Sequence, residues 1–146
     1  MGRKRFRYVP HTADASFIAY GKDMAELIEN AAYAMLCLMF DVKKIESVKK
    51  PAKAIRISEH AHTPENLLWF TLQDILSKID IHSVKAFIFR VSSLKTMPHE
   101  MTLNGALYHK EAGLDAVLLG IKAVTPHGMK IKKTKNGYSV KVVVDI

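Results

Sequence analysis

The sequence HTADASFIAYGKDMAELIENAAYAMLCLMFD, residues 11–41, contains a strand pattern followed directly by a helix pattern. Apolar and polar residues alternate over 14–20, which is typical of a strand with one buried face. Asp23 and Glu26 then have the spacing of a capping box, and apolar residues recur at intervals of three and four positions. The stretch therefore predicts a strand over 14–20 and a helix over 23–39.

The beginning of this predicted strand is polar. His11 and Asp14 lie where the strand starts, just before the chain enters the core helix. A carboxylate fixed at such a place is a candidate metal ligand or acid–base group. Asp is also a common turn residue, so a turn-capping role for Asp14 is the alternative, and the pattern leaves both open.

A second helix is predicted after Thr63, which can cap it, with Pro64 at the first helical position. The segment His60-Ala61-His62 is expected to end the preceding strand. The lysine-rich residues 43–53 are expected to form a solvated connector that makes at most weak contacts with polyanions. Further strands are predicted, in chain order, over residues 5–9, 53–59, 84–92, 99–107, 116–125, 129–134 and 138–145.

Two dipeptides signal turns. Asn104-Gly105 interrupts the strand over 99–107, and Asn136-Gly137 joins the last two strands into a hairpin. The order of elements predicts one domain over residues 1–146 with an α+β fold. Mostly antiparallel sheets would form a sandwich with the two helices grouped on one side. Strands and helices do not alternate regularly, which argues against a doubly wound parallel sheet.

The composition limits the class of protein. Lysine and arginine number 22 against 14 acidic residues, a net charge of +8 that favours an acidic partner such as RNA. The single cysteine, Cys37, cannot form an internal disulfide, which fits a reducing cytoplasm. No apolar run approaches the roughly 20 residues that span a membrane, so no membrane contact is expected.

The chain ends in an apolar strand that is followed by a charge. Val142-Val143-Val144 precedes Asp145 and Ile146, so the terminal carboxylate is expected to be fixed beside Asp145. Hard cations bind carboxylates together with carbonyls and water. A plain polar strand end is the alternative.

Several motifs together resemble the archease family along the whole chain. They are His11-Thr12-Ala13-Asp14, Ala19-Tyr20-Gly21, Glu29-Asn30-Ala31-Ala32, Met39-Phe40-Asp41, Leu67-Leu68-Trp69-Phe70, residues 120–125, His127-Gly128 and residues 143–146. The resemblance implies a protein cofactor of the tRNA-splicing RNA ligase, which joins exon ends with GTP and Mn²⁺. Such a cofactor promotes ligase guanylylation and multiple turnover and is not itself an enzyme.

The resemblance also implies a divalent-metal site formed by Asp14, Asp145 and the carboxylate of Ile146. The ion would be calcium, with magnesium or manganese as alternatives. A ligase-activating lysine is best matched by Lys110, with Lys122 as the second choice, and His11 belongs to the same functional motif. The expected partner is the ligase, with tRNA contacted indirectly. Two other functions stay open, a metal-dependent hydrolase that activates water with these carboxylates and a basic RNA-binding module.

Overall fold

The computed structural model describes residues 4–9 and 14–146, and two antiparallel sheets enclose its core. The strands are β1 (Phe6–Val9), β2 (Ala15–Gly21), β3 (Lys53–Ala61), β4 (Ala86–Met97), β5 (Glu100–His109), β6 (Ala123–Thr125), β7 (Ile131–Thr134) and β8 (Gly137–Asp145). The helices are α1 (Met24–Met39), α2 (Val42–Ser47) and α3 (Pro64–His82), with a 3₁₀ turn η1 (Leu114–Ala116).

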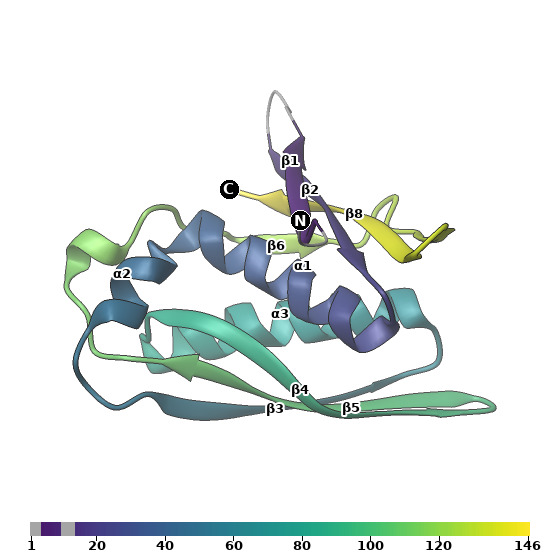
Figure 1. The fold of residues 1–146 in the computed structure, drawn as a ribbon, viewed down its shortest axis with the longest axis horizontal. Coiled ribbons are helices and arrows are strands. Elements are labelled where there is room, and N and C mark those ends of the chain that lie inside the picture. Colours follow the sequence, from purple (N-terminus) through teal and green to yellow (C-terminus); the bar gives the residue numbers. More distant parts are fainter. Residues whose placement is uncertain (1–3, 10–13) are drawn as a thin grey trace.

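The two sheets differ in size. The larger has the order β1-β2-β8-β6, with β7 also paired to β8, and the smaller has the order β3-β5-β4. Helices α1 and α3 lie between the sheets, so each sheet carries helices on one face only (Figure 1). This arrangement confirms the predicted α+β class and its antiparallel sheets. Within the described part of the chain, no helix combines the length and apolar character needed to cross a membrane.

The entry into α1 follows the predicted capping pattern. Asp23 accepts a hydrogen bond from the Glu26 amide (2.9 Å), and the Glu26 carboxylate accepts one from the Lys22 amide (2.9 Å). A Cβ at Gly21 would collide with the backbone of Leu27. The tight corner between β2 and α1 therefore requires glycine and seats the helix directly on the sheet.

Helix α3 begins and ends as its sequence indicates. The Thr63 hydroxyl accepts a hydrogen bond from the Asn66 amide (3.1 Å), and Pro64 occupies the first turn. Ser83 closes the helix in the left-handed conformation with φ 51°. Because the buried stripe of α3 is continuous from Leu67 to Ile79, the helix can contact both sheets.

The connector predicted over 43–53 is partly wrong, because it contains α2. Asp41 caps this helix by accepting a hydrogen bond from the Lys44 amide (3.1 Å). Only Val42 and Ile45 are buried in its six residues. Two apolar positions among lysines are too few to show a helical period in the sequence.

The turn predicted at Asn104-Gly105 is also wrong, since β5 passes through it without interruption. The hairpin instead turns at residues 98–99. A Cβ at Gly105 would lie 2.7 Å from the Phe89 ring. Glycine is therefore present for close packing against a neighbouring strand. Strand β3 likewise continues through His60 to Ala61, beyond its predicted end.

The long strand predicted over 116–125 shortens to β6. Leu118, within the predicted strand, is 58% exposed, and Leu114, just before it, is 84% exposed. The amides of Leu118 and Leu119 donate to one acceptor, the Met39 carbonyl (2.8 and 3.3 Å). The segment thus follows the end of α1 and has no ladder partner over most of its length.

The final hairpin is confirmed, with its turn shifted by one residue. Lys135 and Asn136 form the turn, and Gly137 begins β8 with φ 149°. A Cβ at Gly137 would collide with the Gly21 carbonyl. Close contact between the two strand ends therefore requires glycine there.

Candidate functional site

Two of the predicted metal ligands adjoin the same end of the five-stranded sheet. In the antiparallel pairing of β2 with β8, Ala15 lies opposite Val144. Asp14 lies in a bend directly before β2, and Asp145 is the last residue of β8. Directly opposed residues in such a ladder have Cα atoms about 4.5–5.5 Å apart. The fold thus brings together two carboxylates from opposite ends of the sequence.

The face that carries these carboxylates follows from strand alternation. Val142 and Val144 are fully buried, so Asp145 belongs to the outer face of β8 together with Val143. Asp145 is exposed and Asp14 is partly buried. The carboxylate end of the sheet therefore faces solvent and is accessible to another molecule.

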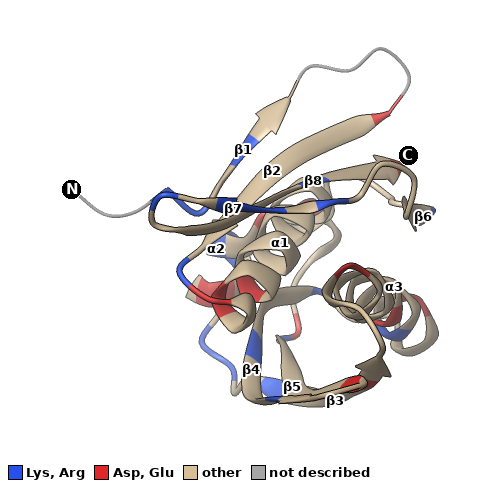
Figure 2. Cartoon of the chain, turned by 90° about the vertical axis from the view of Figure 1, so that its right-hand side faces the viewer, with Lys and Arg blue, Asp and Glu red and all other residues tan. Residues whose placement is uncertain are grey.

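Strand β6 forms the other side of this end. Ala123 lies opposite Asp145, and the Lys122 amide donates to the Asp145 carbonyl (2.7 Å). The same register places Lys122 opposite Ile146, whose side chain is 43% exposed. Figure 2 shows the C-terminus beside β6 and near the beginning of β2. Lys122 is consequently a neighbour of the terminal carboxylate.

Two polar side chains of α3 hold β6 in place. The Trp69 indole donates to the Val124 carbonyl (2.7 Å), and the Gln73 side-chain oxygen accepts from the Val124 amide (2.6 Å). Trp69 belongs to one of the family motifs, but the sequence does not indicate this contact. Since a three-residue strand has few ladder bonds of its own, these contacts fix the position of the chain end.

The other residues with predicted roles are placed differently. Lys110 donates from Nζ to the carbonyls of Glu46 (2.7 Å) and Val48 (3.2 Å), at the end of α2, and its ammonium lies over the Phe87 ring. Lys110 therefore lies in the half of the molecule that contains the three-stranded sheet. His11 lies outside the described residues.

The donor set at the sheet end fits a hard cation in part. Within residues 4–9 and 14–146, no three side chains of His, Cys, Asp or Glu are grouped closely enough to hold a metal ion. Asp14, Asp145 and the terminal carboxylate of Ile146 supply oxygen donors of the kind that calcium prefers. Calcium takes six to eight oxygens, so carbonyls, water or a partner molecule would have to complete this site.

Cys37 has the character of a structural residue. It is half-buried and packs against the core. Burial is the main cause that raises the pKa of its thiol, so the reactive thiolate is disfavoured at neutral pH. A nucleophilic role for this cysteine has no support in its surroundings.

The fold and the carboxylate-bearing sheet end define a class, namely small α+β proteins with two antiparallel sheets around two long helices. Residues 6–146 match the model of the Archease protein family (MTH1598/TM1083). The protein archease of Methanosarcina barkeri is 33% identical over 145 residues, which cover 98% of this chain and 97% of the relative. The chain therefore belongs to the archease family.

Solved structures agree with this assignment. The solution structure of Methanobacterium thermoautotrophicum protein 1598 is similar with a TM-score of 0.80 and 26% identity, covering 97% of this chain and 99% of that one. The crystal structure of an archease from Thermotoga maritima, described as a possible chaperone, has a TM-score of 0.53 and 21% identity, covering 100% and 98%. The latter likeness concerns the fold alone.

Proposed function

We propose that this protein activates a tRNA-splicing RNA ligase, promoting its guanylylation and multiple turnover through a divalent-metal site at the end of the five-stranded sheet. Membership of the archease family supports a role as a protein cofactor. The observation that supports the proposal is the antiparallel pairing of β2 with β8, which ends at Ala15 and Val144, next to Asp14 and Asp145. Asp145 is exposed and Asp14 is partly buried, so a partner protein can reach this end of the sheet.

The chain's own residues would present the metal to the partner. Asp14, Asp145 and the carboxylate of Ile146 would bind it, with calcium the best match and magnesium or manganese as alternatives. A bound divalent ion supplies positive charge that can order a nucleotide and a phosphate for transfer. Since the donor set on this chain is incomplete, the remaining coordination positions would be available to ligase or nucleotide oxygens.

Lys122 is the better candidate for the activating lysine. Its amide donates to the Asp145 carbonyl, next to the last residue, and Lys122 is exposed. The ammonium of Lys110, by contrast, is bound to carbonyls at the end of α2. In this proposal Lys122 would contact a phosphate or carboxylate of the ligase complex, whereas Lys110 would stabilise the fold.

The test is a titration of the protein into a purified ligase with GTP and Mn²⁺. We expect substoichiometric amounts to raise the rate of ligase guanylylation and to permit multiple turnover. Asp145→Asn should lose this effect, whereas Asp80→Asn, the same change at an exposed position on α3, should keep it. Unchanged guanylylation across the titration would refute the proposal. Assays of the protein alone on phosphoesters and on RNA would reveal a hydrolase or an RNA-binding module instead.

A further inference from the structure

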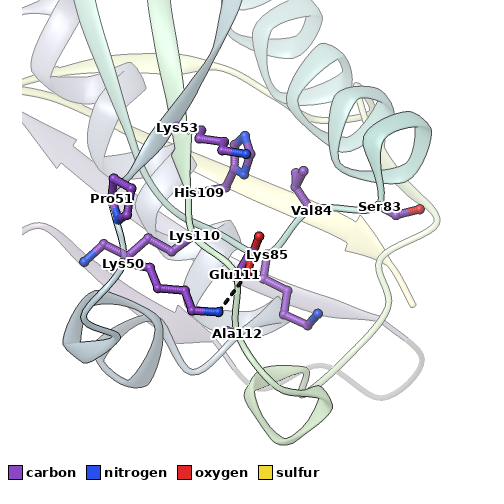
Figure 3. A pocket seen from close by; sticks show the side chains of 10 residues that line it. All are labelled: Lys50, Pro51, Lys53, Ser83, Val84, Lys85, His109, Lys110, Glu111 and Ala112. Carbon is purple, nitrogen blue, oxygen red and sulfur yellow. Dashed lines mark hydrogen bonds and ion pairs between the residues drawn. The ribbon is translucent and has the colours of Figure 1, made fainter.

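A cavity lies at the end of the three-stranded sheet, where β3 and β4 begin and β5 ends. His109 of β5 pairs with Lys53 of β3 on one side and with Ala86 of β4 on the other. The Lys110 amide donates to the Lys85 carbonyl (3.4 Å), which holds the next residues together. These segments enclose a volume of about 440 Å³ (Figure 3). Its size is in the range of small-molecule sites, which is about 300–1,000 Å³.

The charge of this cavity is strongly positive. Lys50, Lys53, Lys85 and Lys110 line it, against the single carboxylate of Glu111. Glu111 pairs with Lys50 (2.8 Å), as Figure 3 shows. Among the described residues, no carboxylate forms an ion pair with Lys53 or Lys85. The lining therefore carries an excess of three positive charges that the protein itself does not neutralise.

The surroundings of His109 show the same positive field. Burial lowers the pKa of its imidazole, and the charges of Lys53 and His82 lower it further. A neutral imidazole can still donate one hydrogen bond to an anion. Lys110 adds charge from a fixed position, because two carbonyls hold its ammonium (2.7 and 3.2 Å). Figure 3 shows Lys53 beside the His109 ring, so a positive charge lies next to a group that can donate a hydrogen bond.

We propose that this cavity binds a phosphate monoester, either of a free nucleotide or at the end of an RNA chain. Lysine ammonium groups bind phosphate as point charges, and a dianion matches the excess charge of the lining. The lysines line one cavity from three separate segments, so one terminal phosphate fits better than a run of backbone phosphodiesters. Pro51, Val84 and Ala112 provide apolar wall for the organic part of the ester. The proposal goes beyond ligase activation and does not depend on it.

Binding should be measured on the full chain with four probes, namely inorganic phosphate, AMP, a 5′-phosphorylated RNA oligonucleotide and its 5′-hydroxyl twin. At an ionic strength of about 0.15 M, we expect the phosphorylated oligonucleotide to bind at least about tenfold more tightly than its twin. Tighter binding of RNA than of AMP would assign the ligand to RNA ends, and the reverse would assign it to free nucleotides. Equal affinity for the two oligonucleotides would overturn the proposal.

Paired variants separate this site from general charge attraction. Lys53→Gln with Lys85→Gln should abolish the preference for the phosphorylated end. Lys132→Gln with Lys133→Gln removes the same charge from exposed positions on β7, in the other sheet, and should preserve it. Glu111→Gln should tighten binding several-fold, because it removes the only carboxylate of the lining. A loss of preference in the β7 control as large as in the cavity variant would overturn the proposal, provided that all variants keep the wild-type melting temperature.

Discussion

At one end of the five-stranded sheet, Asp14 precedes β2 and Asp145 ends β8, which pairs with β2, whereas the three-stranded sheet ends in a cavity lined by lysines. Both ends are assembled by antiparallel ladders that pair residues far apart in the sequence. Each brings residues of like charge to one end of a sheet, and a bound ligand of opposite charge would reduce the repulsion between them. The comparison suggests that one fold offers two ligand sites of opposite charge, a proposed cation site and a proposed phosphate site.

The two ends also differ in how their residues are supported. Asp145 belongs to a strand whose neighbour β6 is held by hydrogen bonds from Trp69 and Gln73. Lys53 and Lys85 instead act through long side chains for which the described residues provide no carboxylate partner. A site on rigid elements depends on each donor, while a set of flexible charges is partly redundant. We therefore expect single substitutions to have larger effects at the acidic end.

The largest effect is predicted for metal binding at the acidic end. Calcium should raise the melting temperature of the wild type, because the ion binds only the native state. Asp145→Asn should weaken calcium binding by at least about tenfold, since it removes a direct donor. An extra residue after Ile146 should weaken it too, as the terminal carboxylate becomes an amide.

Calorimetry with calcium and a parallel melting scan would check this prediction. Lys85→Gln, a substitution at the basic end, should leave the calcium response unchanged and serves as the control. If Asp145→Asn binds calcium like the wild type, the metal site does not lie at this end of the sheet.

The second largest effect is predicted for the hydrogen bond from Trp69 that holds β6 in place. Trp69→Phe keeps an aromatic ring beside Phe70 and removes the indole donor of the Val124 carbonyl. Leaving this acceptor unpaired should lower the free energy of unfolding by about 1–3 kcal/mol. Chemical denaturation would measure the loss. The calcium affinity should fall as well, because β6 positions Asp145; an unchanged affinity would mean that β6 does not organise the site.

Local sequence patterns predicted those elements whose stability is itself local. The cap at Asp23, the cap at Thr63 and the apolar stripe of α3 are all readable within one or two turns of chain. Gly105 was misread because its cause is a contact with Phe89 on a neighbouring strand. The apolar run over 116–125 was misread because the missing feature is a ladder partner, which no local pattern reveals.

The same distinction between local patterns and long-range contacts applies to the candidate site. The carboxylates could be named from the family motifs, but the proposal that Asp14 and Asp145 act together depends on the pairing of β2 with β8. The proposed preference for Lys122 over Lys110 depends on the carbonyls that hold the Lys110 ammonium, which no local pattern reveals. The basic cavity had only a partial sequence signal: Lys50 and Lys53 belong to the lysine-rich run over 43–53, but Lys85 and Lys110 come from segments that meet it only in the folded chain.

A smaller effect should separate the two candidate lysines. Lys110→Met removes charge-assisted hydrogen bonds to the carbonyls of Glu46 and Val48 and should lower stability by about 1–2 kcal/mol. Lys122→Met should leave stability nearly unchanged, because its side chain is exposed. In the guanylylation assay the order should reverse, with activation lost in the Lys122 variant and kept in the Lys110 variant. The opposite result would return the activating role to Lys110.

The smallest effect lies between the two ends, where Glu59 of β3 meets Asp74 of α3. Burial, and then a hydrogen bond and charge repulsion from Asp74, raise the pKa of Glu59 from 4.5 to about 7. Lys78 lies 2.7 Å from Asp74 and opposes this rise only in part. A carboxyl group whose pKa is raised by folding stabilises the native state while it is protonated. Its contribution is therefore complete below pH 4.5 and is lost as the pH rises through about 7.

Glu59→Gln should retain a neutral hydrogen-bonding group at every pH. We expect it to flatten the fall in melting temperature between pH 5 and pH 8 and to stabilise the protein by about 1 kcal/mol at the upper end, a modest value because the pair is partly solvated. Glu100→Gln, the same change at an exposed position on β5, should leave the wild-type profile intact. Because other groups titrate in the same range, the decisive quantity is the difference between the wild-type and variant melting curves. A difference that does not depend on pH would show that Glu59 and Asp74 do not share a proton in the native state.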